Sequence, residues 1–230
     1  MTFEDLMNPE TRERLENLLS SDVYRDNLEF WERAWNMVKE PYTKLPDLEY
    51  LNTIPETLTN RSVRSVLDLG CGTGWLAVYL AKQGFHVTGL DISLHAIKLA
   101  RGWAEKEDLD IHFDVGDIAE LPYPDATFDA VVANSIFEHF PFEVAQVTLQ
   151  KLKRILVPGG TFIGCFDKVG GGPGEYYELA DQTHVYTDKA RKGMLLRYYQ
   201  DEDLKQILNG WKIETLRELE TGTRFVVAFT

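Results

Sequence analysis

One stretch decides the fold: Val66-Leu67-Asp68-Leu69-Gly70-Cys71-Gly72-Thr73-Gly74. Its apolar first half predicts a buried strand, and its glycines predict a tight turn that leads into a helix. Because glycine has no Cβ, the backbone of such a turn can adopt left-handed conformations and approach a ligand closely. A glycine-rich turn on its own is also compatible with a purely structural role, so the flanking sequence has to decide between the two.

Short apolar runs alternate with helical segments from Arg61 onward. This alternation is typical of βαβ units stacked around a parallel sheet, so we expect the core to begin near Arg61. Strands are expected at Ser65 to Leu69, His86 to Leu90, Ile111 to Val115, Ala130 to Ala133 and Thr161 to Phe166, and helices at about Gly74 to Gln83, Ser93 to Lys106 and Phe142 to Leu156.

The C-terminal part adds a loop, a helix and a hairpin. The segment Val169 to Gly174 contains four glycines and a proline, which argues against regular structure. A helix is predicted at Asp201 to Leu208, and the short connection between strands at Lys212 to Leu219 and Arg224 to Phe229 favours an antiparallel hairpin at the sheet edge. The expected fold class is α/β: a doubly wound sheet of about seven strands, mostly parallel, with an antiparallel C-terminal hairpin strand.

Residues 1–60 are predicted to form a helical cap that is separate from the domain at 61–230. Asn8-Pro9 is a typical helix start, and a second start is expected at Ser21 or Asp22. The second helix carries an apolar stripe, ended by Pro41, whose members recur at spacings of three and four: Tyr24, Leu28, Trp31, Trp35 and Val38. Two interpretations of this stripe are open: a lid over a ligand site, or ordinary packing against the sheet.

The composition is that of an ordinary globular protein, with 44% apolar and 27% charged residues among 230. A net charge of −13 would repel a phosphate backbone, so no nucleic-acid partner is expected. Cys71 and Cys165 lack metal-ligand spacing; we expect both to be reduced and predict no metal site. The absence of an export signal and of a long apolar run favours a cytoplasmic location without membrane association.

One residue argues against a dinucleotide-binding turn, and a second indicates a ribose site. The dinucleotide pattern requires glycine where this chain has Trp75, which argues against an NAD pyrophosphate site. Asp91 ends the next strand, 21 residues after Gly70. An acidic residue there can accept hydrogen bonds from both ribose hydroxyls of an adenosyl group. Together these features favour an adenosyl ligand that has no phosphate.

Three further motifs follow in order: Gly116-Asp117-Ile118, Phe128-Asp129-Ala130-Val131-Val132 and Leu152-Lys153-Arg154-Ile155-Leu156-Val157-Pro158-Gly159-Gly160. Together with the glycine-rich stretch, they resemble class I S-adenosylmethionine-dependent methyltransferases over roughly Ser65 to Phe166. The last motif is similar to that of the family's small-molecule branch. The resemblance implies a Rossmann-like fold, S-adenosylmethionine as the cofactor and methyl transfer to a small molecule.

By the same resemblance, the turn and two flanking residues would hold the methionine part of the cofactor. The backbone expected to line it comprises Gly70, Cys71, Gly72 and Gly74. Asp68 would hold the ammonium directly or through water, and the carbonyl of Asn134 would lie beside it. A cap or turn role is the alternative for Asp68.

The adenosyl part would be held by residues that follow the second and third strands. Asp91 would bind the ribose, Asp117 and the backbone N–H of Ile118 would meet the adenine edge, and Ile92 would cover an adenine face. Cap or turn roles are the alternatives for Asp91 and Asp117. Asp129, in contrast, is expected to be a structural turn residue.

Methyl transfer from a sulfonium is an in-line displacement, so the protein mainly aligns the acceptor and removes its proton. The candidate bases are His139, beyond the fourth strand, and His184, after the glycine-rich loop; shaping the pocket wall is the alternative for His139. Candidate substrate contacts, for which core packing is the alternative, are Trp31, Trp35, Tyr176, Arg197 and Tyr198.

Three other functions remain open: a protein or RNA methyltransferase, a non-catalytic S-adenosylmethionine-binding protein and an NAD-dependent oxidoreductase. The fourth strand ends Asn134-Ser135-Ile136-Phe137, without the paired prolines typical of amide-methylating enzymes, so DNA amino methylation is not expected. The acceptor and the oligomeric state are left undetermined.

Overall fold

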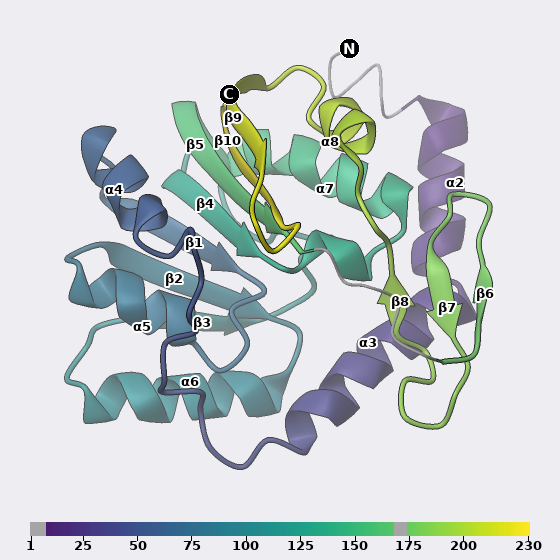
Figure 1. Cartoon of the computed structure of the whole chain (residues 1–230), viewed down its shortest axis with the longest axis horizontal. Coiled ribbons are helices and arrows are strands. Elements are labelled where there is room, and N and C mark those ends of the chain that lie inside the picture. The colour runs from purple at the N-terminus through teal and green to yellow at the C-terminus, as the bar shows by residue number, and fades with distance from the viewer. Residues whose placement is uncertain (1–7, 168–173) are drawn as a thin grey trace.

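The computed structural model describes residues 8–167 and 174–230. The loop predicted at 169–174 therefore lies outside the described residues except for Gly174. The described chain forms a seven-stranded sheet with helices on both faces and a separate three-stranded sheet (Figure 1). None of the helices in these ranges combines the length and the apolarity that crossing a membrane requires.

The large sheet has the strand order β3-β2-β1-β4-β5-β10-β9. Neighbouring strands from β3 to β5 pair in parallel, and β10 pairs antiparallel with both β5 and β9, so the predicted fold class is confirmed. The strand order reverses between β1 and β4, and in such sheets the crevice at the reversal is where ligands bind. The strands are β1 (Ser65–Leu69), β2 (His86–Asp91), β3 (His112–Val115), β4 (Phe128–Asn134), β5 (Leu156–Phe166), β9 (Lys212–Glu218) and β10 (Arg224–Phe229).

The two faces of the sheet are covered by two separate core clusters. Alternate residues of β4 point to opposite faces: Ala130 belongs to the cluster with α4 (Thr53–Asn60), α5 (Trp75–Lys82) and α6 (Leu94–Lys106), and Val131 to the cluster with α7 (Phe142–Ile155) and α8 (Asp201–Ile207). Ile54 and Leu58 of α4 are fully buried in the first of these clusters. Although α4 falls within the predicted cap at 1–60, it packs as part of the core, and we propose that the cap ends before it.

Two helices precede the core, and they begin as predicted. Asn8 Oδ1 accepts a hydrogen bond from the N–H of Thr11 (2.9 Å) at the start of α2 (Pro9–Leu19). Ser21 Oγ does the same for Tyr24 (3.2 Å) at the start of α3 (Asp22–Asn36). The predicted extension of the stripe to Val38 is wrong: α3 ends at Asn36, and the Val38 carbonyl hydrogen-bonds His95 Nε2 (2.8 Å) instead.

A small antiparallel sheet that the sequence does not predict lies beside α3: β6 (Tyr176–Glu178), β7 (His184–Tyr186) and β8 (Leu195–Leu196) (Figure 1). Arg33 of α3 donates a hydrogen bond to the Lys192 carbonyl at 2.7 Å. Gly193 has φ +92°, and a Cβ there would lie 2.5 Å from the Asp26 carbonyl oxygen, so its backbone rests directly on α3. The helix and the small sheet therefore pack as one unit.

Asp129 joins the starts of β1 and β4. Its role is structural, as the sequence predicts, but it lies within strand β4 and not in a turn. Its Oδ2 accepts hydrogen bonds from the N–H groups of Arg64 and Ser65, both at 2.9 Å, and its own N–H donates to Ser65 Oγ. The carboxylate thus holds two backbone donors at the amino end of the sheet.

Asp129→Ala should lower the free energy of unfolding by about 1–2 kcal/mol, because two backbone donors lose a charged acceptor. Urea denaturation would measure the change. Asp129→Asn, which keeps an acceptor oxygen, is the matched control and should lose less. An alanine variant as stable as the parent would show that the clamp contributes nothing.

Candidate active site

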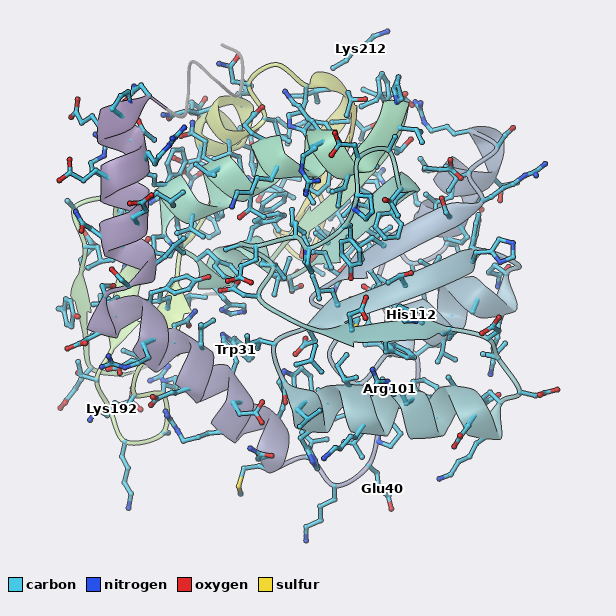
Figure 2. The ribbon with its side chains drawn as sticks, turned by 180° about the vertical axis from the view of Figure 1, so that it is seen from behind. Trp31, Glu40, Arg101, His112, Lys192 and Lys212 are labelled. Carbon is cyan, nitrogen blue, oxygen red and sulfur yellow. The ribbon has the colours of Figure 1, made fainter. Side chains whose placement is uncertain are left out.

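A cavity opens at the carboxyl ends of β1 to β4, where α3 lies across the sheet. Figure 2 shows Trp31 of α3 between the helix and the sheet. The residues that line the cavity are Asn27, Leu28, Trp31, Trp35, Tyr42, Gly70, Cys71, Gly72, Thr73, Trp75, Asp91, Ile92, Asp117, Ile118, Asn134, Ser135, Ile136, His139 and Phe140.

The glycine-rich turn forms one wall of this cavity. Gly70 and Gly72 have φ of +73° and +52°, in the left-handed region that favours glycine. A Cβ on Gly72 would lie 2.7 Å from the Trp35 ring, and one on Gly70 would lie 2.6 Å from Ile136. Only glycine therefore lets the turn lie this close to α3 on one side and to the end of β4 on the other.

Asp91 is buried at the end of β2 and ties that strand to the turn. Its Oδ2 accepts a hydrogen bond from the Gly72 N–H, and its Oδ1 accepts one from the Ser93 N–H, each at 2.9 Å. Burial raises the pKa of Asp91 to about 6, while these two bonds favour the ionised form. Each oxygen keeps a lone pair, so the carboxylate can accept further hydrogen bonds from a ligand in the cavity.

Asp117 lies in the same cavity, in the segment after β3. Its Oδ1 accepts a hydrogen bond from the Ala119 N–H at 2.8 Å. The Tyr24 hydroxyl of α3 donates toward both carboxylate oxygens, at 3.0 and 2.8 Å. Burial and the neighbouring Asp117 charge raise the pKa of Tyr24 well above its usual value, so the hydroxyl stays protonated. Helix α3 thus bonds directly to a carboxylate in the cavity.

His139 lies at the end of a single 3-10 turn, η1 (Phe137–His139), and its partly exposed ring lines the cavity. Its Nδ1 is 3.1 Å from the Leu195 carbonyl oxygen, which can only accept, so Nδ1 carries the proton and Nε2 has the lone pair. The Trp31 ring packs edge-on against the imidazole, with centroids 4.4 Å apart. Burial lowers the pKa of His139 to about 4, so the imidazole is neutral near pH 7.

Comparison with known proteins identifies the region that contains the glycine-rich turn. The family described as "Methyltransferase domain" matches residues 66–160, from β1 into β5. The 2-heptyl-1-hydroxyquinolin-4(1H)-one methyltransferase of Mycobacteroides abscessus is 31% identical over 141 residues, which is 60% of each chain. Residues 66–160 therefore match a methyltransferase domain.

One further curated relative is a methyltransferase, and one solved structure shares the fold. The 27-O-demethylrifamycin SV methyltransferase of Amycolatopsis mediterranei is 33% identical over 147 residues, 62% of this chain and 52% of that one. The solved structure of the PH0226 protein from Pyrococcus horikoshii shares the fold, with a TM-score of 0.69 and 24% identity over 85% of this chain and 98% of that one. The alignments with the two curated methyltransferases thus span at most three fifths of their lengths.

Most residues predicted to hold the cofactor line the cavity of the methyltransferase domain, and two do not. Gly74 lies at the start of α5, where a Cβ would meet the Ala100 Cβ at 3.0 Å, so the glycine permits close helix packing. Asp68 is buried and hydrogen-bonded to the Ala77 backbone in the first turn of α5, which is the cap role left open above. Burial raises the pKa of Asp68 to about 7, and no described group bonds its Oδ2.

Four of the predicted catalytic or substrate residues lie away from the cavity. His184 stacks on Tyr176, with ring centroids 4.0 Å apart, in the small sheet. Arg197 is buried and donates a hydrogen bond to Asp203 at 3.0 Å. The Tyr198 hydroxyl accepts one from Arg224 at 2.9 Å. The structure therefore brings only Trp31, Trp35 and His139 from the predicted catalytic and substrate sets to the cavity.

Several lining residues were not predicted: Asn27, Leu28, Tyr42, Thr73, Trp75, Ser135, Ile136 and Phe140. Asn27 had a readable signal, because it is a polar residue at a stripe position between Tyr24 and Leu28. Ser135 and Ile136 directly follow a predicted strand at the ligand-binding edge. Tyr42 had no such signal, since its position depends on how the chain crosses from α3 to the core. In residues 8–167 and 174–230, no three His, Cys, Asp or Glu side chains group to hold a metal ion.

Glu138, next to His139, is a fully buried carboxyl behind the cavity wall. Its Oε1 accepts a hydrogen bond from the Asp167 N–H, while its Oε2 has no hydrogen-bond partner among the described residues. Burial, together with the nearby Asp167 charge, raises the pKa of Glu138 to about 8. Glu138 is therefore mostly protonated near pH 7 in the folded protein.

Glu138→Gln should become more stable relative to the parent as the pH rises. An unfolded glutamate ionises near its ordinary pKa of about 4.3, so the contribution of Glu138 to stability is complete below that value and is lost as the pH rises through about 8. Glutamine keeps the acceptor for Asp167 but never ionises. Urea denaturation at about pH 5 and about pH 8.5 should show the stability difference moving toward the variant by at least about 1 kcal/mol. A difference independent of pH would contradict the raised pKa.

Proposed function

We propose that the protein transfers a methyl group from S-adenosylmethionine to an apolar, ring-containing small molecule, with His139 as general base. The observation that carries this proposal is the composition of a single cavity. Carboxylates that suit an adenosyl group line it together with apolar rings and a neutral imidazole, and the Trp31 ring packs against that imidazole. A methyl donor and an acceptor fit side by side in such an arrangement.

The cofactor would bind along the strand ends. The free lone pairs of Asp91 suit ribose hydroxyls, and the apolar side chains of Ile92 and Ile118 suit the faces of adenine. Asp117 would accept from the adenine amino group, in competition with or beside the Tyr24 hydroxyl. The backbone of Gly70, Cys71 and Gly72 lines the cavity and would contact the methionine part. When bound, the cofactor supplies an electrophilic methyl group and a neutral thioether leaving group.

The rest of the cavity indicates the acceptor class. Trp31, Trp35, Ile136 and Phe140 give it broad apolar surfaces that suit a planar ring. Among residues 8–167 and 174–230, no lysine or arginine lines it, so these residues offer no cationic partner to a carboxylate or phosphate of an acceptor. The named substrate of the Mycobacteroides abscessus relative, a heptyl hydroxyquinolone, is an acceptor of this kind.

His139 is arranged to remove a proton from this acceptor. With Nδ1 donating to the Leu195 carbonyl, Nε2 can take the proton of an acceptor hydroxyl while that oxygen forms its bond to the methyl carbon. The lowered pKa keeps the imidazole unprotonated across the neutral range, at the cost of a lower basicity of Nε2. Trp31 excludes water from one edge of the ring, which favours attack by the acceptor over solvent.

The position of the cavity supports a small-molecule acceptor over a protein or RNA, and the state of the cysteines supports a reducing compartment. The cavity lies beneath α3 and holds the Trp31 and Trp35 side chains, so a folded macromolecule would meet the helix before it met His139. Cys71 and Cys165 are unpaired and buried, as the reducing cytoplasm allows.

His139→Asn should lower kcat by about 10²- to 10⁴-fold, the usual contribution of a general base, with little change in S-adenosylmethionine affinity. Asparagine keeps a donor for the Leu195 carbonyl and removes Nε2. Release of S-adenosylhomocysteine would be followed with 2-heptyl-1-hydroxyquinolin-4(1H)-one, 27-O-demethylrifamycin SV and related hydroxylated rings.

His184→Asn is the matched control and should keep parental turnover, because His184 lies outside the cavity. Tight cofactor binding with no turnover across the panel would contradict the proposed activity. Parental kcat in His139→Asn would refute the role of His139 alone.

A further inference from the structure

Asn27 is a fully buried polar residue on the face of α3 that meets His139. Its Nδ2 donates a hydrogen bond to the His139 carbonyl oxygen at 2.9 Å. Its Oδ1 accepts one from the Leu195 N–H at 3.0 Å. Since one partner can only accept and the other can only donate, the orientation of the amide is fixed. Burying an amide in an apolar stripe is costly unless both of its ends are bonded, as they are here.

These bonds form a closed ring with the imidazole. Asn27 bonds the backbones of His139 and Leu195, and the Leu195 carbonyl in turn hydrogen-bonds His139 Nδ1 at 3.1 Å. The ring joins α3, η1 and β8. Asn27 is 112 residues from His139 and 168 residues from Leu195 in sequence. One side chain of α3 thus binds the N–H of the residue whose carbonyl faces the imidazole.

We propose that Asn27 is a positioning residue that sets the tautomer and the orientation of His139. By holding the Leu195 N–H, it holds the carbonyl of the same residue against Nδ1. By holding the His139 carbonyl, it fixes the backbone from which the ring projects. The Nδ1–H form then leaves the Nε2 lone pair without a described partner. The catalytic consequence of this tautomer rests on the proposed general base, whereas the tautomer itself does not.

The contact between α3 and the small sheet does not depend on Asn27 alone. Arg33 donates to the Lys192 carbonyl at 2.7 Å, and Gly193 packs against the Asp26 carbonyl. Removing the Asn27 amide should therefore disturb the imidazole while the helix remains attached. Arg33→Ala, which breaks a bond between α3 and the segment before β8 without removing a bond to His139 or Leu195, is the matched control.

The tautomer can be measured directly in protein labelled with ¹⁵N-histidine and saturated with S-adenosylhomocysteine. Two-bond ¹H–¹⁵N correlation spectra distinguish Nδ1–H from Nε2–H, and loss of a signal in His139→Asn assigns His139. We expect Nδ1–H in the parent and in Arg33→Ala. In Asn27→Leu, which has nearly the same shape but no amide, we expect Nε2–H or an averaged pattern.

Asn27→Asp is the second variant and covers the case in which the leucine variant fails to fold. It keeps the acceptor for the Leu195 N–H and loses the donor to the His139 carbonyl, so a smaller shift of the same kind is expected. On the best acceptor of the panel, Asn27→Leu should lower kcat by about 10- to 100-fold with little change in cofactor affinity, as a misplaced catalytic group does.

A parental Nδ1–H pattern in folded Asn27 variants, or an equal disturbance in Arg33→Ala, would overturn the positioning role. A changed tautomer in Asn27→Leu combined with parental turnover in His139→Asn would support the positioning role and refute the general base. The two proposals therefore fail separately.

Discussion

The site depends on one buried carboxylate, that of Asp91. It accepts the N–H groups of Gly72 and Ser93, and so it fixes the glycine-rich turn to the end of β2 and holds the first turn of α6. An ionised carboxylate is costly to bury, and these two backbone bonds offset part of that cost. The shape of the turn therefore depends on a group whose remaining lone pairs face the cavity, which makes the cofactor site part of the framework of the sheet.

Helix α3 combines the two roles that the sequence left open. Leu15 of the adjoining helix α2 and Tyr24 of α3 belong to the core cluster that also contains α7, which is ordinary packing. Leu28, Trp31 and Trp35 line the cavity, which is the position of a lid. The Tyr24 hydroxyl bonds Asp117, and Asn27 bonds the backbone around His139, so the helix contacts both the proposed adenine end and the proposed acceptor end. We propose that α3 is a fixed wall of the site, since its packing is continuous with the core.

The sequence predicted the strands whose boundaries are set by neighbouring residues. The strands Ser65–Leu69 and Arg224–Phe229 were predicted to the residue, because each is an apolar run with clear breaks at both ends. β5 begins at Leu156, earlier than the predicted Thr161, because the strand continues through Pro158-Gly159-Gly160, which by itself favours a stop. β6 to β8 contain only two or three residues each and depend on packing against α3, so no local pattern identified them.

The same distinction holds within the site. Asp91 and Asp117 were found because they follow strands in a recognisable order, and both line the cavity. Arg197 and Tyr198 were expected at the substrate, yet Asp203 and Arg224 bind them elsewhere. Asn27 is visible in the sequence as a polar residue in the apolar stripe, but its partners lie more than a hundred residues away, so its role could not be predicted. Strand ends can be read from sequence, whereas contacts between distant segments require the fold.

Isothermal titration with S-adenosylmethionine and with NAD⁺ tests the central claim most directly, on the parent, Asp91→Ala and the fold control Asp129→Asn. We expect S-adenosylmethionine, and not NAD⁺, to bind the parent and the control, and the Asp91 variant to lose about 1–3 kcal/mol of binding free energy while circular dichroism shows it folded. Parental affinity in a folded Asp91→Ala, or tight NAD⁺ binding to the parent, would contradict the assignment of this cavity to an adenosyl methyl donor.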